Sequence, residues 1–174
     1  MSQLPTCLTP DRADGLIFNE EGRTSTSEAN GTDRNGYIEG DVPQGGVLNV
    51  GHGCVYIVGD VGEAAQLRGR QGVYCARKAS ATTVLDGGNL LIVSDETPEK
   101  DLLQISAKAI GDIPILVVPE SERAAVFDIL VRNDIRSASY SGTIPIRPLQ
   151  NLRKELPSVP MSLYRSGKKL DFPS

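Results

Sequence analysis

The chain has 174 residues, of which 39% are hydrophobic, with three Phe and no Trp, so a single domain with an aliphatic core is expected. Eighteen Gly and eleven Pro exceed what a helical bundle tolerates and favour short strands joined by many turns. The net charge of −4 argues against a general nucleic-acid binder, which usually carries a basic face.

The charge is unevenly distributed along the chain. Residues 147–174 carry six basic and two acidic side chains, a net charge of +4, which leaves −8 for the rest. We interpret this segment, with its four prolines, as a basic extended tail. Such a tail either folds back on the acidic body or docks on an acidic partner or on phosphate.

Cysteine spacing and hydropathy indicate in which cellular compartment the protein is expected. Cys7, Cys54 and Cys75 show no metal-type spacing, and no apolar run of 18 residues or secretion signal is present. We therefore expect a cytoplasmic protein without a metal, a cofactor or a membrane span. The glycosylation sequon at Asn30 is accordingly treated as a chance match.

Residues 1–36 are polar and poor in aliphatic side chains, which predicts a partly disordered arm. The short apolar run Leu16-Ile17-Phe18 interrupts this composition and can add one strand.

Residues 37–95 contain a loose repeat, which predicts a β-rich module. Three segments, starting at residues 45, 64 and 81, share a frame in which a glycine is followed by alternating apolar positions. Alternation with period two indicates strands with one buried face. Repeats of this kind can stack into a coil with a continuous core, or they can form a plain β-meander, and the sequence leaves both open.

The glycines of this module precede strands, whereas a phosphate-binding loop needs a helix start directly after them. We therefore interpret them, with two aspartates, as turn residues of the repeat. The set comprises Gly40, Asp41, Gly53, Gly59, Asp60, Gly72 and Gly88. Asp41 and Asp60 serve turns through hydrogen bonds or form an acidic ladder for a cation.

Residues 89–146 predict a β-α-β-α-β segment packed on the repeat. A continuous apolar strand, 89–95, is followed by a helix from Thr97, taken as the N-cap, to Gly111. A second strand, 113–118, and a second helix, 121–134, precede a closing strand within 135–146. This order predicts a parallel pair with a crossover helix.

Few residues suggest chemistry. His52, the only histidine, lies two residues from Cys54, but no third catalytic partner accompanies the pair, so no catalytic residue is assigned. Ser94, Asp95 and Glu96 follow the carboxyl end of a buried strand, where α/β proteins gather ligands. These three residues either cap the turn or form a small-molecule site.

Two resemblances can be stated for these residues. The stretch "IEGDVPQGGVLNVGHGCVYIVGDVGEAAQLRGRQG" resembles the β-solenoid domains of MinC and the FapA family, and "ARKASATTVLDGG" is similar to the glycine-rich solenoid of glutamate synthase. The resemblance implies a scaffold for dimerisation and partner docking. Residues 77–131 are similar to the L7Ae-type RNA-binding fold, which implies RNA contacts at Arg77 and Lys78, although the basic RNA-contacting surface is missing before the tail.

We therefore expect an α+β protein with a short glycine-cornered β-repeat, a β-α-β-α-β segment and flexible termini. The expected function is a non-catalytic structural or interaction module that forms a homo-oligomer or docks a protein partner. The alternatives are an RNA-binding module and a small-molecule enzyme that uses the Asp95–Glu96 edge.

Overall fold

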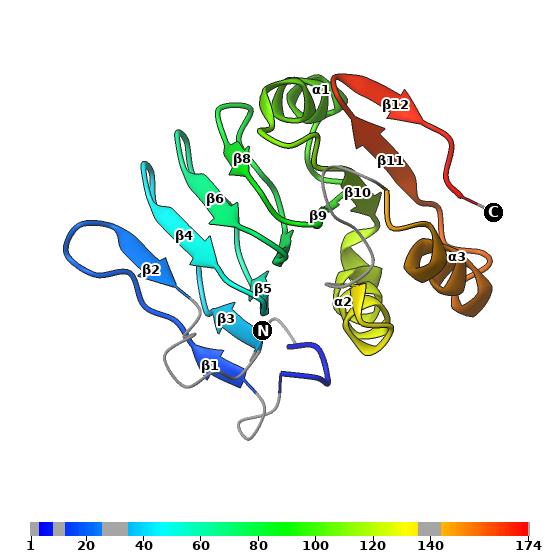
Figure 1. The fold of residues 1–174 in the computed structure, drawn as a ribbon, viewed down its shortest axis with the longest axis horizontal. Helices are drawn as coiled ribbons and strands as arrows, with labels where there is room; N and C mark the ends of the chain where they lie inside the picture. The colour runs from blue at the N-terminus through cyan, green and yellow to red at the C-terminus, as the bar shows by residue number, and fades with distance from the viewer. Residues whose placement is uncertain (1–3, 9–12, 26–34, 136–143, 174) are drawn as a thin grey trace.

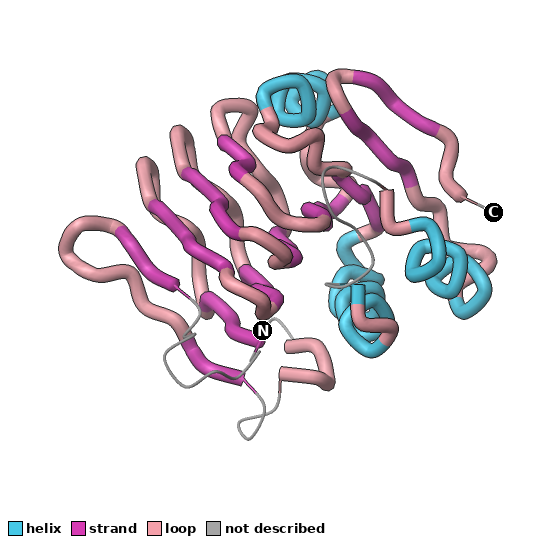
Figure 2. Tube along the Cα trace, in the orientation of Figure 1, coloured by secondary structure: helices cyan, strands magenta, loops and turns pink. Residues whose placement is uncertain are grey.

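The structure is a computed structural model that describes residues 4–8, 13–25, 35–135 and 144–173. It is an α+β fold in which a coil of parallel strands is continued at one end by helices and a β-hairpin (Figure 1). Figure 2 shows that the helices lie toward the C-terminal end of the coil, one of them apart from the others. Two sheets, here named sheet A and sheet B, organise the molecule.

Sheet A has eight strands. In spatial order they are β1 (Ala13–Gly15), β3 (Asn35–Ile38), β5 (Cys54–Ile57), β7 (Val73–Ala76), β9 (Leu90–Ser94), β10 (Ile115–Val118), β11 (Ser162–Arg165) and β12 (Lys168–Leu170). Sheet B has four strands. They are β2 (Arg23–Ser25), β4 (Val47–Val50), β6 (Gln66–Gly69) and β8 (Val84–Asp86).

The repeat of residues 37–95 is a coil and not a meander. Successive strands alternate between the two sheets, and each pairs in parallel with the strand one turn away. Tyr37 lies opposite Tyr56, and Cys54 opposite Val73, so these turns have 19 residues. The next turn is shorter, because Val73 lies opposite Leu90. Neighbouring strands of a meander would run antiparallel, which none of these pairs does.

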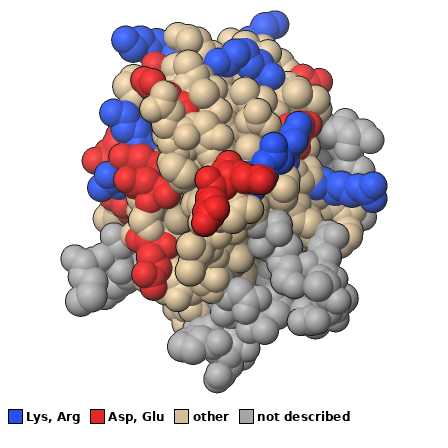
Figure 3. Space-filling model, turned by 90° about the vertical axis from the view of Figure 1, so that its left-hand side faces the viewer, with Lys and Arg blue, Asp and Glu red and all other residues tan. Residues whose placement is uncertain are grey.

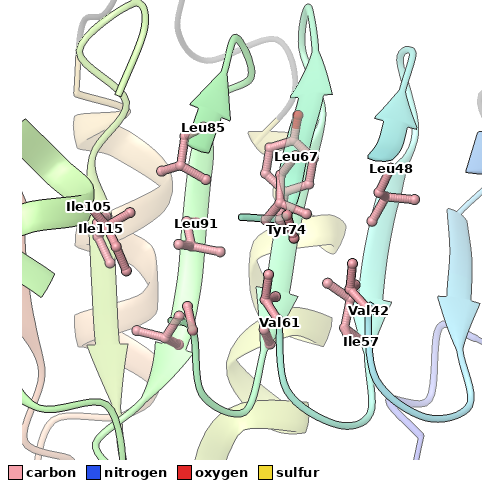
Figure 4. Packing of buried hydrophobic residues seen from close by; sticks show 14 of the residues in the cluster. Val42, Leu48, Ile57, Val61, Leu67, Tyr74, Leu85, Leu91, Ile105 and Ile115 are labelled. Carbon is pink, nitrogen blue, oxygen red and sulfur yellow. The ribbon is translucent and has the colours of Figure 1, made fainter. Parts of the chain in front are cut away.

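The interior of the coil is a ladder of aliphatic side chains from both sheets. Leu48, Leu67 and Leu85 of sheet B occupy equivalent places in successive turns and are fully buried. They face Ile57, Tyr74, Leu91 and other inward side chains of sheet A (Figure 4). Alternate residues of a strand point to opposite faces, so every second residue faces the interior. Equivalent inward residues of successive turns therefore stack to form this core.

The outer face of sheet A is also buried, because α2 (Arg123–Arg132) and α3 (Ile146–Glu155) cover it. Cys54, Tyr56 and Val73 point to this side and pack with Phe127 and Leu149. Burial on both faces explains why these strands carry apolar residues at nearly every position. Helix α2 follows a single 3-10 turn, η1 (Glu120–Glu122).

The predicted crossover is confirmed: β9 and β10 are parallel, and α1 (Glu99–Lys108) connects them. The predicted N-cap is wrong in detail. Pro98 occupies the cap position, and the hydroxyl of Thr97 instead accepts a hydrogen bond from the backbone N–H of Ala79 at 3.2 Å. Thr97 therefore ties the start of α1 to the coil.

Three further expectations need correction. The coil begins at β1 and β2, inside the segment interpreted as a polar arm, because short polar strands can pair through their backbone alone. The rest of that arm, residues 1–3, 9–12 and 26–34, lies outside the described residues, as does the sequon at Asn30. The Leu16–Phe18 run follows β1 as a loop, with Leu16 and Phe18 packed on the core.

The tail is not extended, since it forms α3 and the antiparallel hairpin β11–β12. Pro148 lies in the first turn of α3, where a missing N–H is tolerated, and Leu149 and Leu152 bury the helix on sheet A. The closing strand is β11, which is antiparallel to β10. Within the predicted range 135–146, residues 136–143 lie outside the described part, and α3 starts at Ile146.

Candidate functional site

One column of turns between the sheets stacks through its backbone. The N–H of Gly59 donates to the carbonyl of Gly40 at 2.9 Å, and the N–H of Arg77 donates to that of Gly59 at 2.9 Å. A Cβ at Gly59 would overlap the carboxylate of Asp41, whereas Gly40 has open space around it. The close stacking of turns therefore requires glycine at residue 59 but not at residue 40.

The two aspartates of the repeat lie in this column. Asp41 accepts a hydrogen bond from the backbone N–H of Asp60 at 2.7 Å. Asp60 in turn accepts two from Arg77, at 2.8 Å from Nε and 3.0 Å from Nη2. This bidentate pair lowers the pKa of Asp60 and raises that of Arg77. Among the described residues, no group of three His, Cys, Asp or Glu side chains is arranged to hold a metal ion.

Ser94, Asp95 and Glu96 lie at the end of β9, at the level of Arg77. The Ser94 hydroxyl donates to the carbonyl of Arg77 at 2.5 Å and accepts from the N–H of Glu96 at 3.3 Å. The Asp95 N–H donates to the carbonyl of Val118 at 2.8 Å, and the side chains of Asp95 and Glu96 are exposed. Ser94 thus holds the turn together, as expected of a capping residue.

Arg77 and Lys78 are both exposed, but the guanidinium of Arg77 is flanked by carboxylates. It pairs with Asp60, and its Nε lies 3.9 Å from Glu96. A phosphate ligand of Arg77 would have to displace Asp60 from two hydrogen bonds. This arrangement gives the RNA-binding alternative no support.

The second column of turns contains Gly53, Gly72 and Gly88. His52 is exposed there, and its Nδ1 lies 3.2 Å from Oε1 of Gln71 in the next turn. Cys54 is fully buried under α2 and α3 with Cys75, so it shares no accessible surface with His52. Burial raises the pKa of the Cys75 thiol to about 12, which keeps it protonated and unreactive.

A buried arginine, which sequence analysis missed, fixes α2 to the coil. Arg123 is 1% exposed and lies over the ring of Tyr56, with 4.6 Å from Cζ to the ring centroid. It donates hydrogen bonds to the carbonyls of Ile57 at 2.7 Å and Val58 at 2.9 Å, and to Glu120 at 3.2 Å. The N–H groups of Arg123 therefore hold α2 on the coil. An arginine at the start of a helix is usually exposed, so the sequence did not indicate this role.

The N-terminal edge of sheet A is open. Leu16 donates its N–H to the carbonyl of Tyr37 at 2.9 Å, so by the alternation of a parallel pair the backbone groups of Ala13 and Gly15 point away from β3. In the described part of the chain, β3 is the only neighbour of β1. Beside this edge, Ile17 is 87% exposed and lines an apolar hollow with Leu16, Phe18 and Ile38.

The edge of sheet B at the same end is partly blocked by the turn that precedes β2. The N–H of Asn19 donates to the carbonyl of Arg23 at 2.9 Å, and the Asn19 side chain accepts from the N–H of Arg23 at 3.0 Å. Both backbone groups of Arg23 on β2 are therefore already bonded. Asn19 therefore occupies the outward backbone groups at the start of β2, which reduces the open edge of sheet B at this end.

The C-terminal edge of sheet A is β12, at the opposite end of the molecule from β1 (Figure 1). Its turn is fixed to the body by two hydrogen bonds of 2.9 Å, from Ser166 to Asp112 and from the N–H of Gly167 to Ser106. Sheet B does not reach this end, because a single bridge from Asp86 to Ile110 follows β8. Sheet A alone is open at this end.

The two open edges carry opposite charges. We name as the head edge β1 with Ile17, Glu20, Glu21 and Glu39, and as the tail edge β12 with Arg165, Lys168 and Lys169. None of these charged side chains forms an ion pair with a described residue. The basic residues nearest in sequence to β1 are Arg12 and Arg23, and the acidic residue nearest to β12 is Asp171. The three carboxylates of the head edge and the three basic side chains of the tail edge outnumber these opposite charges, so a smaller surplus remains at the head than at the tail. Figure 3 shows acidic side chains gathered at the centre and left of the face that carries the first turns.

Comparison of the chain with protein-family models, with curated proteins and with solved structures finds no match. Within the described residues, no helix has the length and apolar character needed to cross a membrane.

Proposed function

We propose that this protein is a non-catalytic structural module that assembles with further copies of itself. The observation that carries the proposal is the pair of open edges of sheet A, one at each end of the molecule. An unpaired strand edge offers backbone donors and acceptors to another strand, and proteins that do not use such an edge usually block it. Asn19 blocks the start of β2 in sheet B in this way, whereas no described residue does so at β1.

The chemistry of the candidate residues supports the same proposal. The groups that sequence analysis offered for ligand or RNA binding, Ser94 and Arg77, form hydrogen bonds that hold the stacked turns. The cysteines in the core of sheet A are buried. These contacts stabilise the coil and leave the exposed edges as the surfaces with unused bonding capacity.

Sedimentation velocity over a range of protein concentrations tests self-association. We expect the wild type to form species larger than the 18.6 kDa monomer, and Ile17→Asp to weaken this association because it places a charge in the apolar contact at the head edge. Ile146→Asp is the matched control, since Ile146 is 46% exposed on α3, away from both edges. A wild type that stays monomeric at all concentrations would contradict the proposal.

A further inference from the structure

We infer that the copies assemble head to tail, with β12 of one molecule pairing in parallel with β1 of the next, so that sheet A continues from copy to copy. This inference rests on the proposed function and adds the direction of assembly. The occupant of the head edge is thus the tail edge of a second copy of this chain.

The first argument is the match between the two ends. At the head, the described residues leave β1 open while Asn19 blocks the start of β2, and at the tail, β12 extends beyond the last strand of sheet B. Each end therefore offers one strand edge of the same sheet. If β1 and β2 of one copy both paired with the tail of the next copy, β2 would have no strand of sheet B there to pair with.

Strand direction supplies the second argument. From β1 to β10 the strands of sheet A are parallel, β11 is antiparallel to β10, and β12 is antiparallel to β11. The hairpin thus restores the original direction, and β12 runs parallel to β1. A simple translation of one copy along the sheet places β12 beside β1 in the parallel arrangement used throughout the coil.

Charge decides between this arrangement and a two-fold one. A head-to-head dimer would bring Glu20, Glu21 and Glu39 of both copies together, and such like-charge contacts are strongly unfavourable. Head-to-tail assembly brings the end of the coil that carries these carboxylates against Arg165, Lys168 and Lys169, which form no ion pair with a described residue of their own molecule. Lysines on an edge strand discourage pairing with most strands, and an acidic partner edge removes that penalty.

The arrangement also has a consequence for size. Head-to-tail contacts are heterologous, so each copy leaves one edge open for the next, and the chain of molecules grows unless the rotation closes a ring. A head-to-head contact stops at a dimer. The distribution of species therefore distinguishes the two arrangements.

Charge reversal at each edge gives the decisive experiment. The tail variant carries Lys168→Glu and Lys169→Glu, and the head variant carries Glu20→Lys and Glu21→Lys. Each variant alone should associate at least roughly tenfold more weakly than the wild type, because like charges then meet at every contact. An equimolar mixture should recover assembly, since the basic head of one variant fits the acidic tail of the other.

The control variant, Arg70→Glu with Lys154→Glu, makes the same change in net charge as the tail variant, at exposed sites outside both edges, and should assemble as the wild type does. A tail variant that assembles normally would overturn the head-to-tail inference, because the tail edge would then play no part in the contact, and self-association as such would still hold. A mixture that fails to recover assembly also overturns it. A monomeric wild type is a different result, because it removes the proposed function itself.

Discussion

At the scale of single residues, the spacing between stacked turns decides which glycines the chain needs. Gly59 and Gly72 face the neighbouring turn so closely that a methyl group would overlap it, whereas the same group at Gly40 would meet nothing. All three look alike in the sequence, because each follows or precedes a strand of the repeat. Glycine content predicted the tight turns, but the contact that makes a given glycine necessary comes from the preceding turn of the coil, at Asp41 for Gly59 and at Val50 for Gly72.

The first prediction concerns Gly72. We expect Gly72→Ala to lower the free energy of unfolding by about 1–3 kcal/mol, because its Cβ would overlap the rigid, β-branched side chain of Val50. Gly40→Ala, the matched control, should change the stability by less than about 0.5 kcal/mol. Urea denaturation followed by circular dichroism measures both values. Equal losses in the two variants would show that the turns do not stack as closely as described.

At the scale of elements, the sequence predicted those strands and helices whose apolar side chains recur with a regular period. The alternating apolar positions and recurrent glycines indicated the coil, and the pattern after residue 96 indicated α1 and β10. The strands β1 and β2 were not predicted from the sequence, because they pair through backbone groups and contribute almost no apolar side chain. The helix α3 was not predicted either, because a proline such as Pro148 indicates the end of a helix unless it is known to lie in the first turn.

The open edges of sheet A were also not predictable from the sequence. A strand edge is a property of the sheet order, and neither β1 nor β12 differs in composition from the loops around it. The basic tail was visible as a charge surplus, whereas its position at the end of sheet A depends on the hairpin that folds it there. Sequence thus predicted the charge of this surface but not its structural role.

The ion pair that joins two elements of the coil predicts a dependence on pH. Arg77 lowers the pKa of Asp60 below the value of about 3.9 expected in the unfolded chain, so this pair stabilises the fold above that pH. The contribution is lost as the pH falls through the lower pKa of the folded state. Because both side chains are largely exposed, we expect it to stay below about 1 kcal/mol.

The measurement compares the wild type with Arg77→Met by urea denaturation at neutral and acidic pH. The stability difference between them should shrink as the pH falls below about 4, when Asp60 takes up a proton. Arg70→Met provides the control, since Arg70 is exposed and has no ion pair with a described residue. A difference for Arg77→Met that does not vary with pH would mean that Arg77 acts through packing alone.

At the scale of the whole molecule, the coil and the helical part share sheet A and cannot be separated into independent units. The outer face of β5, β7 and β9 is covered by α2 and α3 together with Leu8 of the N-terminal segment, and Arg123 bonds α2 to the carbonyl end of β5. Removal of the helices would expose apolar side chains on three strands. Stacked repeats often unfold one by one, because each contacts only its neighbours. The cover provided by α2 and α3 extends over several turns and opposes such stepwise unfolding.

We therefore predict that β5, β7, β9 and α2 unfold as one cooperative unit. In native-state hydrogen exchange at increasing urea, their amides should converge on the same opening free energy, equal to that of global unfolding. β1 and β2 should exchange through smaller openings, since neither helix covers them and each has one neighbouring strand in the described structure. Arg123→Met should lower the common free energy by about 1–3 kcal/mol, because it leaves the buried carbonyl of Ile57 without its donor, whereas the partly exposed carboxylate of Glu120 remains solvated. If α2 exchanged well before β5 and β7, the helices would be a loosely attached cap, and the continuity of sheet A would not determine how the molecule unfolds.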